Sequence, residues 1–182
     1  MPLQLHTPRL LLRPFRDSDL DPLAAMCADP VVMKHFPSLQ SREDAEAMYG
    51  RIQQHWNDFG YGAFALEIPG EHTFAGFVGF THPRWEAHFT PCIEILWRLI
   101  APAHGKGYCT EAASACLNWG FSEKGFTEVY SFTTPGNIPS WRVMEKIGMK
   151  REGEFDHPMV EEGHELRRHL LYRVIRPLNS DG

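Results

Sequence analysis

The segment from residue 93 to residue 113 combines a carboxylate with a glycine-rich turn that could bind an anion. Residues 93–100 alternate in polarity, which predicts a half-buried strand, and the composition beyond the turn favours a helix. Gly105 and Gly107 lie between the two, and glycine lets a backbone turn sharply and approach a ligand. The first turn of a helix presents free N–H groups and the positive end of the helix dipole. We therefore expect a phosphate-bearing cofactor at residues 104–110.

Two familiar phosphate-binding motifs do not fit this turn. The P-loop pattern G-x-x-x-x-G-K-[ST] occurs nowhere in the chain. A dinucleotide fingerprint G-x-G-x-x-G/A beginning at Gly105 would end at position 110, where Thr110 stands. For the glycines alone, an ordinary tight connection without a ligand remains the alternative.

Glu94 is the candidate general base in the predicted strand. It lies on the face opposite Ile93 and Ile95, and a cleft on that face would raise the pKa of its carboxyl group into a useful range. The alternative is a carboxylate on a solvated face, or one paired with Arg98.

Length and composition predict a single domain over residues 1–182, with residues 176–182 as a flexible tail. A net charge of −5 argues against a nucleic-acid surface. The first thirty residues carry only the short apolar run 10–12, so we expect neither a signal peptide nor a membrane span, and a cytoplasmic location. The cysteines lack C-x-x-C spacing and are expected to be reduced thiols: Cys27, Cys92, Cys109 and Cys116.

The order of predicted elements indicates an α+β (α/β mixed) fold. The strands are expected at 9–13, 61–68, 73–80, 92–99, 127–133, 149–155 and 167–174. The helices are expected after the caps at 17–19, from Ser41 to Gly60, and at 107–123 and 139–147. Strands in a meander before the glycine turn, followed by a strand–helix–strand unit, predict a mixed sheet rather than a doubly wound domain.

Four segments share a family pattern: TPRLLLR at 7–13, EILW at 94–97, HGKGYCTEA at 104–112 and NIPSWRVMEKIGM at 137–149. With them the chain resembles the GNAT superfamily of N-acetyltransferases, in particular its RimJ/RimL-like branch of ribosomal-protein N-terminal acetyltransferases. The resemblance covers residue 7 to about residue 175. It implies a GNAT-like acyl-CoA N-acyltransferase fold with a central, mostly antiparallel mixed sheet flanked by helices.

The resemblance also implies an activity, the transfer of an acetyl group from acetyl-CoA to a primary amine by direct attack in a ternary complex. The acceptor would be a peptide N-terminus or a small molecule, and the resemblance is compatible with a homodimer. The family's turn motif [Q/R]-x-x-G-x-[G/A] falls on His104, Gly107 and Cys109, of which only the glycine matches strictly. His104 is either an added donor or an exposed loop histidine. The implied CoA pyrophosphate site is Gly105, Lys106, Gly107, Tyr108, Cys109 and Thr110.

Further site residues follow from the resemblance. The backbone near Leu99 would stabilise the oxyanion, and the amide of Asn137 would pair with pantetheine. Many members carry a tyrosine as general acid seven residues after that asparagine, where this chain has Met144. Ser140 becomes the leading acid, with Tyr108 second and no acid a third option. The alternative is that Asn137 ends a loop and Ser140 caps a helix.

The loop at 155–165 before the last strand carries His157 and His164, and His169 follows within that strand. The spacing of the three histidines fits no familiar zinc pattern, so no metal is expected. We interpret the carboxylates of this loop as an acidic rim that attracts an amine: Glu161, Glu162 and Glu165. Two other functions remain open, a non-catalytic acyl-CoA-binding module on the same fold and a nucleotide-dependent oxidoreductase.

Overall fold

The computed structural model describes residues 3–176. Its strands are β1 (Leu5–His6), β2 (Leu11–Arg13), β3 (Ala63–Ile68), β4 (His72–Thr81), β5 (Glu94–Leu99), β6 (Glu128–Thr133), β7 (Lys150–Asp156) and β8 (Arg168–Ile175). Its helices are α1 (Leu20–Cys27), α2 (Arg42–Phe59), α3 (Tyr108–Glu123) and α4 (Ile138–Lys146), with short 3-10 turns at Asp17–Asp19 and Ala101–Ala103.

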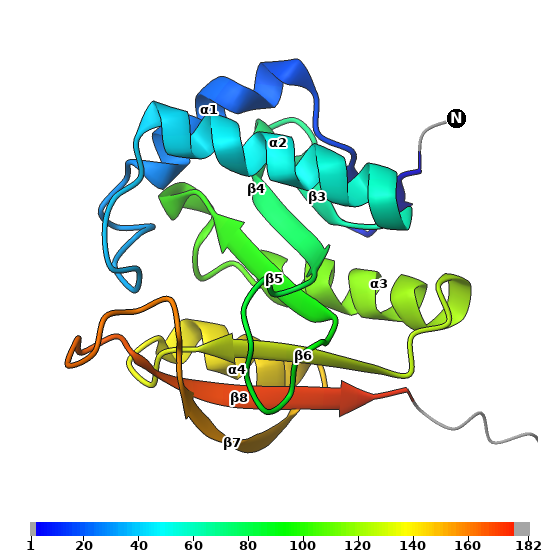
Figure 1. Cartoon of the computed structure of the whole chain (residues 1–182). Helices are drawn as coiled ribbons and strands as arrows, with labels where there is room; N and C mark the ends of the chain where they lie inside the picture. The colour runs from blue at the N-terminus through cyan, green and yellow to red at the C-terminus, as the bar shows by residue number, and fades with distance from the viewer. Residues whose placement is uncertain (1–2, 177–182) are drawn as a thin grey trace, which may run out of the picture.

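The strands form one eight-stranded sheet in the order β1-β2-β3-β4-β5-β6-β8-β7. All neighbouring pairs are antiparallel except β5 and β6, which are parallel and connected through α3. Figure 1 shows the result as two halves, β1–β5 under α1 and α2, and β6–β8 with α4. The predicted mixed, mostly antiparallel sheet is confirmed.

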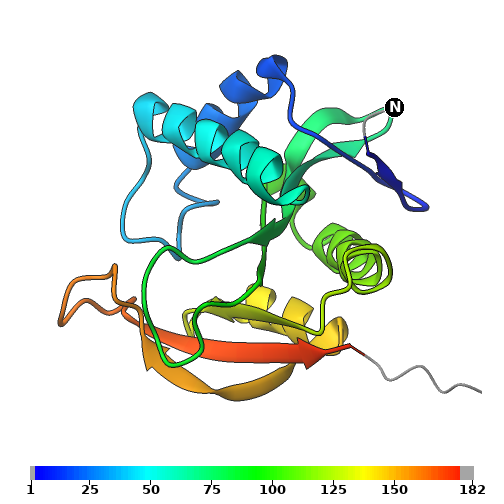
Figure 2. The ribbon, with the colours of Figure 1, turned by 45° about the vertical axis from the view of Figure 1, so that its right-hand side comes forward.

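Helices cover both faces of the sheet (Figure 2). On one face, α1 and α2 pack on the first half through a buried cluster that includes Leu23, Ala45 and Phe77. On the other, α3 and α4 contribute to a larger cluster with Ile95 and Val129 at its centre. Side chains of β5 alternate between these faces because successive residues of a strand point to opposite sides. Each face of the sheet therefore has its own apolar core.

The long helix α2 begins and ends where the sequence predicts. The Ser41 hydroxyl accepts a hydrogen bond from the Asp44 N–H, and the Asp44 carboxylate accepts one from the Ser41 N–H. Gly60 ends the helix in the left-handed conformation, with φ of 66°. Phe59 lies in the last turn of the helix, at the rim, and is 48% exposed.

The N-terminal region differs from the prediction in two ways. The predicted strand 9–13 is shortened to β2, and the additional short strand β1 pairs with it. The carboxylate of Asp19 was expected to cap a helix, but it accepts hydrogen bonds from both Nη atoms of Arg13, at 2.7 and 2.9 Å. A buried arginine requires a counter-charge, and this demand takes precedence over the local capping preference.

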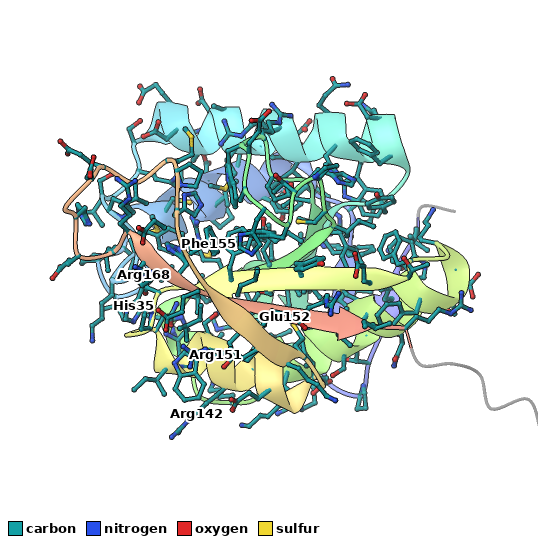
Figure 3. The ribbon with its side chains drawn as sticks, turned by 60° about the horizontal axis from the view of Figure 1, so that its bottom comes forward. His35, Arg142, Arg151, Glu152, Phe155 and Arg168 are labelled. Atoms are coloured by element: carbon teal, nitrogen blue, oxygen red, sulfur yellow. The ribbon has the colours of Figure 1, made fainter. Side chains whose placement is uncertain are left out.

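The second half of the sheet has an outer and an inner side. Figure 3 shows the outer side, where Arg151 and Glu152 lie on β7 and Arg142 lies on α4. On the inner side, the loop between β4 and β5 packs aromatic rings on the sheet, as in the contact of Trp85 with Phe155 at 5.8 Å between ring centres. This loop therefore bridges the two halves.

The C-terminal end of β8 is tied to the sheet, since the N–H of Arg176 donates to the carbonyl of Thr127 at 2.8 Å. The rest of the expected flexible tail, residues 177–182, lies outside the described residues. Among residues 3–176, the helices lack the length and apolar character needed to cross a bilayer.

We predict that Asp19→Ala destabilises the protein severely. Arg13 is 1% exposed, and without Asp19 its guanidinium would keep Glu67 as its one carboxylate partner, beside the backbone carbonyls of Pro14 and Thr73. Breaking a buried ion pair costs about 3–5 kcal/mol. Thermal unfolding should therefore occur at a temperature lower by roughly 6–12 °C or more.

The matched control is Asp21→Ala. Asp21 pairs with Arg42 at the surface, and its side chain is 81% exposed. Loss of such a pair should cost less than about 1 kcal/mol. Equal effects of the two substitutions would contradict the importance of the buried pair.

Candidate active site

Strands β5 and β6 diverge directly beyond a single point of contact. They are paired only at Glu94 and Tyr130. The carbonyl of Ile93 accepts a hydrogen bond from the Tyr130 N–H at 2.8 Å, and the carbonyl of Ile95 accepts one from the Ser131 hydroxyl at 2.9 Å. Beyond this point the two strands form no further pairs. A parallel pair that separates leaves backbone groups of β5 available for a ligand.

The alternation of the β4–β5 ladder identifies these groups. The N–H of Ile100 donates to the carbonyl of Ala75 at 3.0 Å, so this pair is hydrogen bonded. Bonded and non-bonded pairs alternate along an antiparallel ladder. Leu99 and Trp97 are then non-bonded, and their N–H groups point away from β4, toward the side of β6. The predicted donor at Leu99 has this orientation. No local sequence pattern indicates Trp97 as a second donor, because its orientation depends on the register of β5 on β4.

A cavity of about 350 Å³ lies where the strands diverge. Its walls include Glu94 and Leu96 from β5, Ser131 and Thr133 from β6, and Asn137 at the start of α4. Apolar walls with a few convergent polar groups are typical of ligand sites. The cavity collects one predicted catalytic residue and one predicted cofactor contact that lie 43 positions apart in the chain.

The Glu94 carboxylate is well placed to exchange a proton. Burial raises its pKa from 4.5 to about 8. Pairing with Arg98 is not observed, since within residues 3–176 Glu94 forms no ion pair. The four-residue separation along a strand corresponds to roughly 13 Å. An unpaired carboxyl group with a pKa near neutrality is a candidate general acid or base.

The glycine turn before α3 needs both of its glycines. Gly105 and Gly107 have φ of 74° and 81°, in the left-handed region that other residues rarely adopt. Gly107 is the N-cap of α3, so the N–H groups of residues 108–110 form the first turn and lack helical partners. A phosphate placed there would meet these donors and the positive end of the helix dipole. Burial raises the pKa of the Cys109 thiol to about 12, consistent with a packing role.

His104 stabilises the turn from within. Its Nε2 lies 2.9 Å from the carbonyl oxygen of Leu99 and therefore carries the proton in the neutral ring. The other ring nitrogen is then an acceptor, so a neutral His104 offers no donor to a phosphate through that atom. Lys106 is exposed, with its ammonium 4.0 Å from Glu71.

A clamp from the N-terminal arm, not foreseen in the sequence, fixes the start of α3. The Glu111 carboxylate accepts hydrogen bonds from the Thr7 hydroxyl at 2.6 Å and from Arg9 Nε at 2.6 Å. Arg9 also donates to the carbonyl of Lys106 and lies over the Tyr108 ring. Although burial opposes it, these hydrogen bonds hold the pKa of Glu111 below its usual value. The sequence signal for this contact is that residues 7–13 and residues 104–112 both belong to the family pattern.

Asn137 and Ser140 occupy the first turn of α4. Asn137 is the N-cap residue, but its side-chain amide donates to the Thr133 hydroxyl at 3.0 Å. The amide thus lies at the cavity wall. Ser140, three residues after Asn137, is half-buried and does not line the cavity. Its side chain does not cap the helix. Met144 is 1% exposed and belongs to the core.

Two histidines lie at the cavity, His157 directly after β7 and His169 on β8. His157 and His169 line it, with ring centres 4.9 Å apart. Burial and the neighbouring His169 lower the pKa of His157 to about 4. Within the described part of the chain, no three metal-ligating side chains converge. The glutamates of the proposed acidic rim are exposed and lie outside the cavity lining: Glu161, Glu162 and Glu165.

Comparison with known proteins agrees with this geometry. The family model described as Acetyltransferase (GNAT) domain matches residues 9–150.

The chain belongs to the GNAT acetyltransferase family.

Among its relatives, a protein described as "Uncharacterized N-acetyltransferase YnaD" of Bacillus subtilis is 32% identical over 174 residues, which cover 95% of this chain and 97% of the relative. A GNAT-family acetyltransferase from Bacillus anthracis has a TM-score of 0.78 at 30% identity, covering 96% of this chain and 99% of its own. RimJ of Mycobacterium smegmatis shares the fold, with a TM-score of 0.70 at 19% identity over 96% of this chain and 86% of its own.

Membership makes the chain an N-acetyltransferase, with acetyl-CoA as the donor and an amine as the acceptor. The meandering sheet and this membership together remove the oxidoreductase alternative. The observed turn fits a CoA pyrophosphate, since a Cβ at Gly105 would have no neighbour within 4 Å and the α3 N–H groups are free of helical partners.

We predict that Gly107→Ala weakens acetyl-CoA binding about tenfold. Alanine in the left-handed region is strained by about 1–2 kcal/mol, which favours a rearranged turn with misdirected N–H groups. Calorimetric titration with acetyl-CoA measures the change. The matched control is Gly50→Ala. Gly50 lies in α2, and a Cβ there would meet no atom within 4 Å, so this substitution should not affect binding. Unchanged affinity in a folded Gly107→Ala protein would refute binding by this turn.

Proposed function

We propose that this GNAT enzyme transfers the acetyl group of acetyl-CoA to a primary amine by direct attack in a ternary complex, with Glu94 as general base. The acceptor is a protein N-terminal α-amine, as in the RimJ/RimL-like branch, or a small-molecule amine. One observation carries the proposal: the half-buried Glu94 carboxyl group, which forms no ion pair among the described residues, lies in the cavity between the diverging strands. In this proposal, residues 104–110 hold the pyrophosphate and Asn137 holds the pantetheine.

The pKa of Glu94 suits the deprotonation of an amine. An α-amino group has a pKa near 8, close to the value of about 8 for Glu94. Proton transfer between groups of similar pKa is nearly balanced, so Glu94 can accept the ammonium proton directly or through a water molecule. A lysine side chain, with a pKa near 10.4, would make a larger demand on the base.

Acetyl-CoA supplies the acetyl group as an activated thioester. The N–H groups of Leu99 and Trp97 point toward β6, where they can donate to the carbonyl oxygen as negative charge develops on it. Preorganised backbone donors of this kind need no reorganisation during the reaction. Ser140 would return a proton to the departing thiolate. Tyr108 is buried at the start of α3 and remains the second choice.

We predict that Glu94→Gln lowers kcat/KM about 100-fold or more, because general base catalysis contributes about 10² to 10⁴ in rate. The test is thiol release from acetyl-CoA with a panel of amines. In the native protein, activity should rise with pH and level off above about 8, as Glu94 loses its proton. A pH profile identical in the two proteins would refute Glu94 as the base.

Glu94 also predicts a pH-dependent stability that can be measured without substrate. Its pKa is raised by burial, so the folded state favours the protonated form and loses stability as pH rises from about 4.3 toward about 8. Glutamine stays neutral, so Glu94→Gln should gain thermal stability relative to the native protein at pH 9 and not at pH 4. Glu123→Gln, exposed at the end of α3, is the control and should show no such gain.

We predict that Ser140→Ala lowers kcat more than it changes the affinity for acetyl-CoA. Ser140 lies in the first turn of α4, three residues after Asn137, which lines the cavity. Steady-state kinetics and calorimetric binding separate the two effects. Ser122→Ala, exposed near the end of α3, is the control. Unchanged turnover in Ser140→Ala would exclude the serine from the acid role and favour departure of the thiolate without an acid.

A further inference from the structure

Arg98 is a half-buried cation without a carboxylate partner among residues 3–176. Its Nη1 donates to Cys27 Sγ at 3.3 Å and to Gln40 Oε1 at 3.2 Å, a cysteine sulfur and a side-chain amide rather than a carboxylate. Its guanidinium lies 4.2 Å from the ring centre of Phe36 and 5.5 Å from that of Phe77. Burial lowers its pKa, but an arginine cannot shed its proton in a protein. The positive charge therefore remains in a partly desolvated site.

One edge of this guanidinium has no partner. The Nε atom of Arg98 is buried and has no hydrogen-bond acceptor, and no described residue accepts from Nη2. Nε and Nη2 form the side-on edge that binds a carboxylate with two parallel hydrogen bonds. A buried donor without an acceptor is costly, and a buried charge without a counter-charge costs more. A ligand with a carboxylate would remove both penalties.

A second cavity, of about 270 Å³, lies beside the first, between α2 and the β4–β5 ladder. Its lining carries three arginines and no carboxylate: Arg51, Arg84 and Arg98. Arg51 and Arg84 are exposed and form no ion pair within the described residues. This composition is opposite in sign to the net charge of −5 of the chain. The cavity therefore attracts anions. The exposed glutamates of the loop at 161–165 carry negative charge and would repel them.

A buried histidine in the same cavity has a free ring nitrogen. His55 is 8% exposed, and its Nδ1 lies 2.8 Å from the carbonyl oxygen of Tyr61, which places the proton on Nδ1. Its Nε2 is buried without a partner. In the neutral ring this atom is an acceptor, suited to an N–H or O–H of a ligand. His82, stacked on His55, uses both nitrogens in hydrogen bonds with Tyr61 and Cys92.

Arg98 and the candidate base share one face of β5. Glu94, Leu96 and Arg98 alternate onto the same side, and Leu96 and Arg98 line both cavities. A molecule at the junction of the two cavities can thus contact Arg98 with its anionic group, while its amine reaches Glu94, which lines the first cavity, through a water molecule. The volume suits a compact molecule rather than a long polyamine or a folded protein surface.

We infer that the acceptor is a compact amine that carries a carboxylate, a molecule of the amino-acid class, with its carboxylate bound by Arg98. The inference rests on the proposed function and narrows its acceptor. It separates free amino acids from peptide N-termini, in which the group next to the amine is a neutral amide. Arg84 and Arg51 add a longer-range attraction at the mouth, and His55 adds a hydrogen-bond acceptor inside.

Matched pairs of acceptors test the inference. Each L-amino acid is compared with its carboxamide in thiol release from acetyl-CoA, at saturating acetyl-CoA. The two differ in the carboxylate, and the lower amine pKa of the amide works against the expected result. At least one amino acid should have a kcat/KM about 100-fold above that of its carboxamide. A carboxamide, a decarboxylated amine or a peptide that reacts as well as every amino acid would overturn the inference.

Three variants assign the preference to the arginines. Arg98→Met should lower kcat/KM for the preferred amino acid about 100-fold and change that for its carboxamide less than threefold, whereas a merely structural role would lower both. Arg84 is exposed, so the Arg84→Met protein should fold even if Arg98→Met does not. Arg84→Met should lower kcat/KM for the preferred amino acid about fivefold. Arg176→Met, exposed at the end of β8, is the matched control with no change.

Calorimetric binding of amino acids to the CoA-bound protein separates this inference from the proposed function. Binding that depends on Arg98, with no thiol release from any amine, would refute the transfer to an amine and retain the carboxylate site. Thiol release without preference for carboxylates would retain the transfer and refute the site.

Discussion

The divergence of β5 from β6 is the constraint on which the rest of the structure depends. The sheet is continuous except where these parallel strands separate after one pair, at Glu94 and Tyr130. Backbone N–H and C=O groups that leave a sheet must find other partners. At this opening they become a binding surface, with the N–H groups of Leu99 and Trp97 on the wall. The helix that connects the two strands, α3, places its free N–H groups at the same end.

Two arginines, Arg13 buried and Arg98 half-buried, differ in how their charge is compensated. Arg13 is enclosed by Asp19 and Glu67, and its charge is neutralised within the fold. Arg98 is held by a thiol, an amide and two aromatic rings, none of which neutralises it. A folded protein tolerates the first arrangement permanently. The second is costly until an anion binds, which is why we assign Arg98 to ligand recognition.

The site also shows how separate networks position the cofactor turn. The N-terminal arm fixes the start of α3 through Glu111, and His104 fixes the end of β5 through the Leu99 carbonyl. Rigid support of this kind holds donors in place before a ligand arrives, which reduces the entropy lost on binding. None of these supporting contacts touches the reacting atoms. Their substitution is expected to act through the orientation of the turn.

The sequence by itself determined the local elements and the family. Periodicity, caps and glycines located the strands, the ends of α2 and the turn at 104–110, because such signals act over a few residues. Only the tertiary structure decided what depends on neighbours distant in the chain. The register directs Trp97 and Leu99 toward β6, and burial sets the pKa of Glu94 near 8. The end of α1 and the segment that follows it pack on β4 and β5 and surround Arg98 without a carboxylate partner among the described residues. These properties arise from desolvation and from the alignment of separate segments, which no local pattern encodes.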